Sequence, residues 1–277
     1  MVTGSTDGVG RVVAKRLGEG GVRVLVHGRD RERGERLVAE IKAAGGDAAF
    51  LAADLSSLAE VRGLAGTVRQ TTDRLDLLIN NAGIGSGGPQ ATRETSADGY
   101  ELRFAVNYLA GFLLTHLLLP LVEQGTPARI VNVSSLGQQA IDFSDVMLTR
   151  GYSGSRAYCQ SKLAQILFTI DLAQELEGAG VTVNALHPAT YMNTTMVRRA
   201  GATPMSTVEE GADAILNLAA SAELEGRSGL YFNGQREARA DGQAYDVEAR
   251  RRLKAVSMEL VGLSGTAPNK NGRSRSS

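Results

Sequence analysis

Thr3-Gly4-Ser5-Thr6-Asp7-Gly8-Val9-Gly10 is a glycine-rich turn close to the start of the chain. It runs into apolar residues at helical spacing, namely Val12, Val13, Ala14 and Leu17. Glycines let a backbone turn tightly and approach a pyrophosphate, which then sits on the free N–H groups of a helix N-terminus. A tight loop without a ligand is the alternative, so a dinucleotide site needs support from elsewhere in the chain.

A second stretch, Tyr158-Cys159-Gln160-Ser161-Lys162, begins a strongly apolar helical pattern far downstream. Residues four apart share one face of a helix, so the Tyr158 phenol and the Lys162 ammonium are predicted to lie one turn apart. A nearby cation favours the phenolate and lowers the pKa of a tyrosine, which suits a proton donor and acceptor for a carbonyl/alcohol pair. A surface helix with a chance tyrosine and lysine is the alternative for this stretch alone.

Short apolar runs alternate with helical patterns along the chain, which is typical of a parallel sheet flanked by helices. The predicted strands are 22–27, 48–52, 75–79, 129–133, 181–186 and 230–232. The predicted helices after the first are 30–44, 57–69, 100–122, 156–176, 207–220 and 248–260. The sequence therefore predicts an α/β fold: a single doubly wound Rossmann domain over 1–262, followed by a disordered tail over 263–277 that lacks apolar periodicity.

The first strand of this sheet is expected to be truncated at the N-terminus. In a doubly wound sheet the glycine turn follows a central strand, and a buried parallel strand has about five apolar residues. Only Met1 and Val2 precede Thr3. We therefore expect the functional chain to begin upstream of Met1 with an apolar run. A shortened form that folds with a remnant strand, or with a substitute from elsewhere, is the alternative.

Composition narrows the classes of function. The chain has 277 residues with 30 Lys and Arg against 30 Asp and Glu, a balance that does not favour nucleic acid as a partner. Its single cysteine, Cys159, excludes an intrachain disulfide and fits a reducing cytosol. We see no signal peptide, and the longest apolar run, 108–122, is too short and interrupted for a membrane span. The three histidines are too scattered to predict a metal site, so we expect a metal-free, cytoplasmic protein.

Four motifs in order resemble the short-chain dehydrogenase/reductase family over residues 1 to about 262. They are the glycine turn TGxxxGxG at 3–10, Asn-Asn-Ala-Gly at 80–83, Val-Asn-Val-Ser-Ser at 131–135 and YxxxK at 158–162. The stretches 106–109, 157–164 and 228–232 look most like its retinol-dehydrogenase-like branch. Membrane-anchored members of that branch carry an N-terminal apolar segment, which we do not see before the glycine turn. The resemblance implies a hydride-transferring enzyme with a nicotinamide cofactor.

The resemblance implies four catalytic residues, Asn107, Ser135, Tyr158 and Lys162. Tyr158 gives or takes a proton, Ser135 hydrogen-bonds the carbonyl oxygen of the substrate, and Lys162 biases Tyr158 and holds the nicotinamide ribose. Asn107 holds a water that links Lys162 to solvent, although a capping amide is the alternative. Ser134 is the alternative to Ser135 within Val-Ser-Ser.

The resemblance also implies where the cofactor binds. Arg29, after the strand over 22–27, accommodates a 2′-phosphate and favours NADP(H) over NAD(H). Asp7 points the other way, as does Asp30 unless it serves as a helix N-cap, so NAD(H) stays an alternative. Asp54 and its neighbour lie where the family contacts the adenine ring. The implied cofactor-binding residues are Gly4, Ser5, Thr6, Asp7, Gly8, Val9, Arg29, Asp54, Leu55, Asn81, Ala82, Gly83, Tyr158 and Lys162.

Two segments depart from the family pattern. His187-Pro188-Ala189-Thr190 replaces the usual Pro-Gly, which leaves either Thr194 or Thr195 to reach the carboxamide. The link over 136–157 is longer than usual, and with 191–205 it is expected to form an apolar wall of the substrate pocket. Such a wall favours an apolar or bulky substrate. Packing of the link against the core is an equal alternative.

Three functions are open. The favoured one is an NADP(H)-dependent oxidoreductase, a carbonyl reductase or alcohol dehydrogenase acting on a small carbonyl or alcohol substrate. The others are a non-catalytic NADP-binding regulator and another reaction on the same fold, such as epimerisation or dehydration of a sugar nucleotide. The joint presence of all four catalytic residues favours the enzyme. The helices over 100–122 and 156–176 are more apolar than a one-sided surface helix needs, which with the resemblance allows a homodimer or homotetramer.

Overall fold

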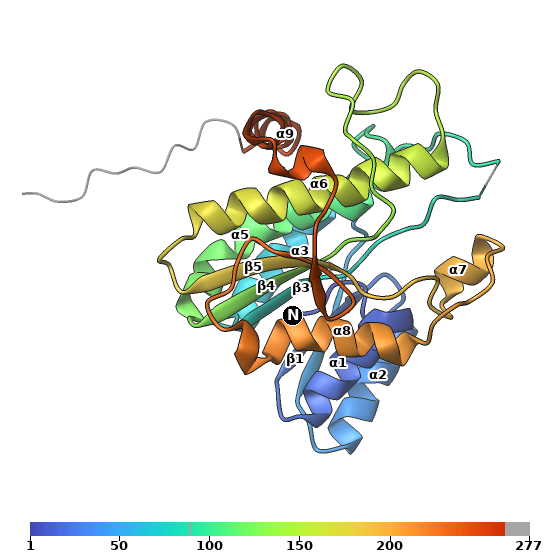
Figure 1. Ribbon diagram of the computed structural model, residues 1–277. Coiled ribbons are helices and arrows are strands. Elements are labelled where there is room, and N and C mark those ends of the chain that lie inside the picture. The colour runs from blue at the N-terminus through green and yellow to red at the C-terminus, as the bar shows by residue number, and fades with distance from the viewer. Residues whose placement is uncertain (89, 264–277) are drawn as a thin grey trace, which may run out of the picture.

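The computed structural model describes residues 1–88 and 90–263, so the expected disordered tail lies outside the described residues apart from Leu263. A mostly parallel sheet is covered by helices on both faces (Figure 1). The predicted α/β fold in a single domain is confirmed. The strands are β1 (Val24–Gly28), β2 (Ala48–Ala52), β3 (Leu77–Asn80), β4 (Ala128–Val133), β5 (Val181–His187), β6 (Tyr231–Asn233) and β7 (Arg236–Ala238).

Strand pairing follows the doubly wound pattern. β1 pairs in parallel with β2, while β3, β4, β5 and β6 pair in parallel in that order. β7 runs antiparallel along β6. Each of the six predicted strands is present with its ends shifted by up to two residues. The edge strand β7 is not predicted, because three residues that are mostly exposed leave no apolar pattern.

Residues 1–3 fill the gap between these two groups of strands. Val2 pairs in parallel with β1 on one side and β3 on the other. The Val2 N–H donates to Leu25 O (3.1 Å), the Thr3 N–H donates to Ile79 O (2.9 Å), and the Ile79 N–H donates to Met1 O (2.9 Å). A truncated first strand thus precedes the glycine turn, as expected. The expectation of an apolar run upstream of Met1 stays a prediction.

The helices form two layers (Figure 1). One face of the sheet carries α1 (Gly8–Glu19), α2 (Arg31–Ala43) and α8 (Val208–Ala220). The other carries α3 (Leu58–Thr71), α5 (Ala110–Gln124) and α6 (Gly154–Glu175), with α9 (Val247–Leu260) packed on α6. Shorter pieces are α4 (Leu102–Phe104), a π-helical turn (Ala105–Leu109), α7 (Thr195–Arg199) and two 3₁₀ turns (Ala222–Leu224 and Gly242–Tyr245).

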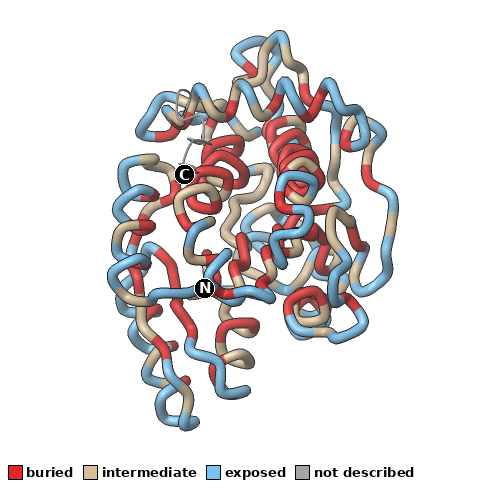
Figure 2. The backbone as a smooth tube through the Cα atoms, turned by 90° about the vertical axis from the view of Figure 1, so that its left-hand side faces the viewer, coloured by how far each residue is buried: buried red, intermediate tan, exposed pale blue. Residues whose placement is uncertain are grey.

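Two hydrophobic cores lie on either side of the sheet. Figure 2 shows buried backbone running through the interior and exposed backbone on the outer turns. Leu78, Leu113 and Ile166 belong to the core under α3, α5 and α6, whereas Val13 and Ile215 belong to the core under α1, α2 and α8. Most of α6 is buried because the sheet lies on one side of it and α9 on the other. The buried side chains of α6, apolar and polar alike, therefore find their partners within the chain.

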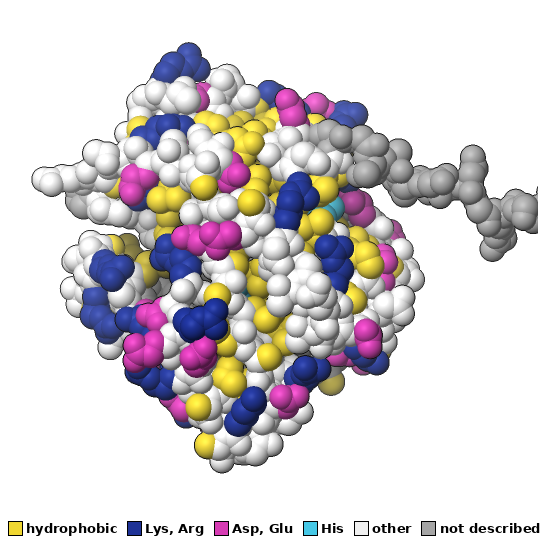
Figure 3. Space-filling model, turned by 180° about the vertical axis from the view of Figure 1, so that it is seen from behind, with side chains coloured by type: hydrophobic (Ala, Val, Ile, Leu, Met, Phe, Trp, Pro, Cys, Tyr) yellow, Lys and Arg dark blue, Asp and Glu magenta, His cyan; other side chains and the backbone are white. Residues whose placement is uncertain are grey.

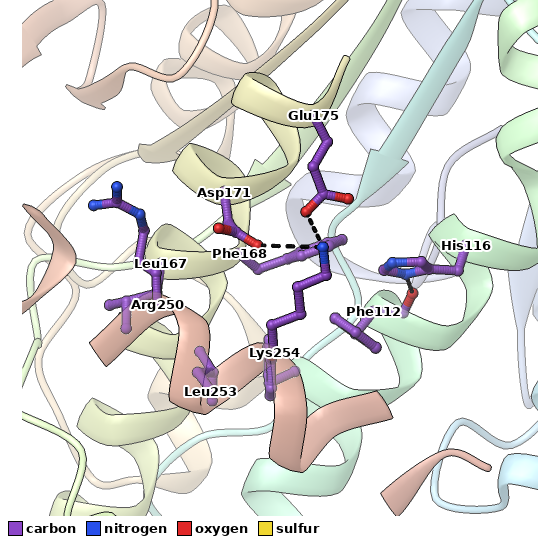
Figure 4. A pocket seen from close by; sticks show the side chains of 10 residues that line it. Phe112, His116, Leu167, Phe168, Asp171, Glu175, Arg250, Leu253 and Lys254 are labelled. Carbon is purple, nitrogen blue, oxygen red and sulfur yellow. Dashed lines mark hydrogen bonds and ion pairs between the residues drawn. The ribbon is translucent and has the colours of Figure 1, made fainter. Parts of the chain in front are cut away.

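The C-terminal helix α9 is held by polar contacts as well as apolar ones. Lys254 pairs with Asp171 (3.9 Å) and with Glu175, both on α6 (Figure 4). The Tyr108 hydroxyl and the Ser257 hydroxyl are hydrogen-bonded at 2.8 Å, which ties α9 to the helix that precedes α5. These contacts place α9 over part of the surface that the sequence suggested for a subunit interface.

The helical stretch Leu102–Gln124 is longer than the apolar run seen in the sequence, because α4, the π-helical turn and α5 are continuous. By length and composition alone, these 23 residues could cross a membrane, yet 61% of the most apolar window is buried inside the protein. Such burial is also usual for a core helix. The absence of a membrane span stays a prediction.

Candidate active site

The predicted catalytic side chains come together where the strands end. Ser135 follows β4, Tyr158 and Lys162 lie in the first half of α6, and Asn107 sits in the π-helical turn. Ser153 begins α6 as its N-cap, with its side chain accepting from the N–H three residues on. In the part of the chain that the structure describes, no group of three or more possible metal ligands occurs, and the absence of a metal stays a prediction.

Ser135 is the serine beside Tyr158. A Cβ on Gly137 would lie 3.5 Å from both Ser135 Oγ and Tyr158 Cε1, so the two side chains are neighbours, and Ser135 Oγ accepts from the Gly137 N–H (3.0 Å). The Ser134 hydroxyl instead donates to Lys162 O (2.7 Å) and is buried between β4 and α6. The geometry therefore favours Ser135 for contact with a substrate and gives Ser134 a structural role.

Burial controls the ionisation of Tyr158. It raises the pKa of the phenol, while the neighbouring Ser135 hydroxyl works in the opposite direction. The expected lowering by the lysine is not seen, because Lys162 Nζ lies 5.8 Å from the centroid of the Tyr158 ring and contacts other groups. Tyr158 is thus a protonated phenol at neutral pH in this arrangement.

Lys162 is a buried ammonium group with two fixed acceptors. Its Nζ donates to Val133 O (2.9 Å) and to Gln165 Oε1 (3.0 Å). Burial lowers the pKa of Lys162 to about 7. The charge on this lysine is therefore sensitive to its few polar neighbours.

Asn107 joins two walls of the site. Its Oδ1 accepts from the Ile84 N–H (2.7 Å), and its Nδ2 donates to Ile84 O (3.1 Å) and to Ser161 Oγ (2.9 Å). These contacts hold the loop after β3 against α6. The π-helical turn, a geometry often found at functional sites, places the amide there. The role implied by the resemblance, holding a water beside Lys162, stays a prediction.

The glycine turn has the shape of a dinucleotide cradle. Gly4 has a φ of +62°, and a Cβ there would lie 2.8 Å from Ala82 Cα. A Cβ on Gly10 would lie 2.3 Å from Asn81 Nδ2, the atom that donates to Thr3 O (2.9 Å) and Gly4 O (3.1 Å). Side chains at these glycines would separate the turn from the loop after β3. The residues present thus fit a nucleotide held between the turn and that loop.

The other predicted turn residues divide into packing and capping roles. Ser5 and Val9 are buried, and the Thr6 side chain lies against the end of β1. Asp7 caps α1, accepting from the Gly8 N–H at 2.8 Å. Contacts from Ser5, Thr6 and Val9 to a cofactor would therefore come mainly from the backbone.

Two residues outside the predicted set hold the turn in place. The Thr3 hydroxyl accepts from the Asn81 N–H (2.9 Å) and the Ala82 N–H (3.0 Å). His27 Nδ1 accepts from the Gly4 N–H (3.1 Å). Burial lowers the pKa of His27 to about 4, so the imidazole is neutral and keeps its acceptor at pH 7. The sequence signals are a hydroxyl residue before Gly4 and a histidine at a strand end.

Two arginines lie beside the cradle. Arg29 is exposed, with 69% of its side chain accessible, and pairs with Asp54 at 3.5 Å. Arg33, which is not among the predicted residues, contacts Asp7 (3.6 Å) and Asp30 (3.2 Å). Asp30 caps α2 by accepting from the Arg33 N–H (3.0 Å), which is the role expected for it. Arg33 thus brings a positive charge to the acidic position in the turn.

Asp54 and Leu55 follow β2 at the predicted adenine position. Asp54 Oδ1 accepts from the Ser56 N–H (2.9 Å). Burial opposes ionisation, but the hydrogen bonds from Ser56 and the charge of Arg29 together lower the pKa of Asp54. The Leu55 side chain belongs to the core.

The link over 136–157 mostly packs against the core. Ile141 and Leu148 are buried, and Gln243 binds the Ile141 backbone through an N–H···Oε1 bond (2.6 Å) and an Nε2–H···O bond (3.1 Å). This corrects the expectation that the apolar side chains of the link line the pocket. The link is long, and core contacts bury its apolar residues.

The segment 191–205 lies against the cradle. The Thr194 methyl lies 3.3 Å from the position of a Cβ on Gly8, and Met196 lies 3.1 Å from that of a Cβ on Gly85. Thr194, rather than Thr195, is therefore the threonine beside the turn. Four large apolar side chains near this edge remain exposed, namely Leu136, Tyr191, Met196 and Met205.

Fold, cradle and catalytic cluster together define a nicotinamide-dependent oxidoreductase, and the chain belongs to the short chain dehydrogenase family, whose family model matches residues 1–205. Human retinol dehydrogenase 13 is 39% identical over 283 aligned residues, which cover 95% of this chain and 84% of that protein. Human retinol dehydrogenase 11 is 37% identical over 276 aligned residues, which cover 95% of this chain and 85% of that protein. The retinol-dehydrogenase-like branch is thereby confirmed.

Solved structures show the same fold. A Pseudomonas aeruginosa RhlG/NADP active-site complex has a TM-score of 0.68 and 29% identity, covering 84% of this chain and 92% of that one. A metagenomic short-chain oxidoreductase in complex with NADP has a TM-score of 0.65 and 28% identity, covering 86% and 96%. The protein is thus a hydride-transfer oxidoreductase of the alcohol/carbonyl class.

Proposed function

We propose that this oxidoreductase uses NADP(H) to interconvert the carbonyl and alcohol forms of an apolar small molecule. The observation that carries the proposal is the neighbouring pair Ser135 and Tyr158, with Lys162 one helical turn away and the glycine cradle alongside. A cytoplasmic location stays a prediction from composition. Figure 3 shows both signs of charge interspersed over one face, which does not favour nucleic acid as a partner.

The chain's own residues move the proton. A nicotinamide, when bound, supplies or accepts the hydride. The raised pKa keeps Tyr158 protonated at neutral pH, which is the form that protonates a carbonyl oxygen during reduction. The Ser135 hydroxyl hydrogen-bonds the same oxygen and stabilises its developing charge. Lys162 supplies positive charge and would hold the nicotinamide ribose, and the turn N–H groups at the start of α1 would hold the pyrophosphate.

The exposed rim of the site supports an apolar substrate. Tyr191 is 54% and Met205 72% exposed, and Leu136 directly follows the catalytic serine. Apolar side chains left in water beside a catalytic cluster are typical of sites that bind apolar ligands. The relatives' name, retinol dehydrogenase, agrees with an apolar substrate.

The cofactor preference depends on Arg29. An arginine–phosphate contact is worth about 1.5–3 kcal/mol, so NADPH should bind at least about tenfold more tightly than NADH. Affinities of both cofactors are measured in wild type and in Arg29→Ala, which should lose most of the preference. Arg31→Ala is the matched control, because Arg31 is an exposed arginine two residues further on, at the start of α2, where it pairs with Glu35.

Equal affinities of wild type for NADPH and NADH would contradict the cofactor proposal. Turnover is tested with a panel of ketones, aldehydes and alcohols of increasing apolar size, read at the nicotinamide absorbance band. Tight NADPH binding without turnover on any of them would favour the alternative, a non-catalytic regulator.

A further inference from the structure

Gln165 is the nearest side-chain partner of the Lys162 ammonium. It lies one turn further along α6, and its Oε1 accepts from Lys162 Nζ at 3.0 Å. The second acceptor is Val133 O at 2.9 Å. Lys162 is 5% exposed and Gln165 is 4% exposed, so water replaces neither contact easily. An ammonium has three N–H donors, and these two acceptors take two of them.

The Gln165 turn is itself fixed to the sheet. Tyr158, Lys162, Gln165 and Thr169 follow at intervals of four, three and four, which puts them on one face of α6. The Thr169 hydroxyl donates to Gln165 O (2.8 Å) and accepts from Asn132 Nδ2 (2.8 Å). The polar stripe therefore runs from the catalytic tyrosine to a side chain on β4, and Gln165 lies in its middle.

We propose that Gln165 is a positioning residue that keeps the buried Lys162 ammonium charged and directs it within the site. This inference rests on the proposed function, in which Lys162 acts through its charge. An amide oxygen at hydrogen-bond distance stabilises the ammonium over the neutral amine, and its loss would leave a buried charged donor without that partner. The lowered pKa of Lys162, about 7, means that a small change in its surroundings alters its charge near neutral pH.

Two substitutions of Gln165 should shift the pKa of Lys162 in opposite directions. Gln165→Met keeps the length of the side chain but removes the acceptor, and it should lower the Lys162 pKa by about one unit. Gln165→Glu puts a carboxylate at the same place, and it should raise the pKa by at least about one unit. A purely structural role for Gln165 predicts no such pair of opposite shifts.

The experiment reads the lysine directly, without cofactor or substrate. The chain has five lysines, Lys15, Lys42, Lys162, Lys254 and Lys270. Protein labelled with ¹³C at lysine Cε is titrated by NMR, and Lys162→Arg assigns the Lys162 signal. Gln160→Met is the matched control, because Gln160 is also buried on α6 but donates to Ala140 O (2.9 Å) and should leave the titration unchanged.

Opposite shifts in the Met and Glu variants support the inference. An unchanged Lys162 titration in Gln165→Met, or shifts in the same direction in both variants, would overturn it. If Gln165→Met does not fold, Gln165→Glu decides alone, and a pKa that is unchanged or lower overturns the inference. Because no cofactor is present, this outcome is independent of whether NADP(H) is the cofactor.

Discussion

The Tyr158 phenol and the Lys162 ammonium have separable roles. Tyr158→Phe removes the proton donor but keeps the ring, so turnover should fall by at least about a thousandfold while NADPH affinity stays within about threefold. Lys162→Met removes a buried charge that would hold the ribose, and it should damage both turnover and binding. Turnover is followed at the nicotinamide band and binding by nicotinamide fluorescence. Retained turnover in the Phe variant would mean that another group is the acid.

The buried histidines make the free energy of unfolding depend on pH. Burial, reinforced by the charge of Lys162, lowers the pKa of His187 to about 4, whereas an unfolded histidine titrates near 6.5. The unfolded state therefore binds more protons between pH 4 and 6.5, so the free energy of unfolding is fully present above this window and falls as pH drops through it. His187 should account for about 2 kcal/mol of the loss between pH 7.5 and 5.

The measurement is chemical unfolding at pH 7.5, 6 and 5 in wild type and His187→Asn. The variant should show the shallower decline, because Asn does not titrate. Parallel declines in the two proteins would show that His187 is protonated in the folded state as readily as in the unfolded one. His27, with its pKa also lowered to about 4, is left in place and contributes equally to both.

At the residue scale, the catalytic residues were easier to predict from the sequence than the residues that hold the site in place. Ser135, Tyr158, Lys162 and Asn107 lie together as the motifs implied, although the tyrosine pKa is raised by burial rather than lowered by the lysine. The sequence shows a hydroxyl residue before Gly4, but the supporting role of Thr3 could not be predicted from it, because its hydrogen-bond partners Asn81 and Ala82 lie more than seventy residues away. Short sequence motifs do not show which residues meet across such a separation.

At the scale of elements, the joint between the glycine turn and the loop after β3 is a testable unit. Thr3→Val keeps the shape of the side chain but removes the acceptor for the Asn81 and Ala82 N–H groups. We expect the free energy of unfolding to fall by about 1–3 kcal/mol and NADPH to bind more weakly. Thr3→Ser, which keeps the hydroxyl, is the control. Equal losses in both variants in urea unfolding would point to the methyl group instead.

The ends of helices and strands depend on tertiary contacts, which the periodicity of the sequence does not show. The strand predicted from Leu75 begins at Leu77, because the Leu75 N–H instead donates to Leu121 O (2.9 Å) on α5. The helix predicted over 100–122 is one continuous stretch with a π-helical turn inside it. The link over 136–157 was the least predictable segment, because in the sequence its apolar residues fit a pocket wall and a core equally well. The structure shows Ile141 and Leu148 buried in the core.

At the scale of the whole molecule, α9 covers apolar surface of α5 and α6 that would otherwise be exposed to solvent. Leu253 is buried against α5 and α6, so Leu253→Asp would place a charge there and should detach the helix. The exposed surface should then drive association, seen as a higher mass in light scattering and a lower melting temperature than wild type. Val247→Asp is the control, because Val247 is on the same helix and 65% exposed. Identical mass and melting in the two variants would contradict this role of α9.

The single-domain architecture was predictable because alternating apolar runs leave few other arrangements. The place of α9 was not, since its periodicity shows an apolar face but not which helices it covers. The predicted homodimer or homotetramer stays a prediction. It now has to accommodate α9 on part of the surface that α5 and α6 would offer.

The short pairing at Val2 makes a seam between two blocks of the sheet. In the described residues, β1 and β2 form one block, β3 to β7 form the other, and residues 1–3 bridge them. Proteins open locally in cooperative units whose free energies differ, and a block joined by few backbone bonds is expected to open first. Amide hydrogen exchange should therefore be faster in β1 and β2 than in β4 and β5. Under the proposed function, NADPH held between the glycine turn and the loop after β3 would bridge the two blocks, so it should slow exchange in β1 and β2 the most.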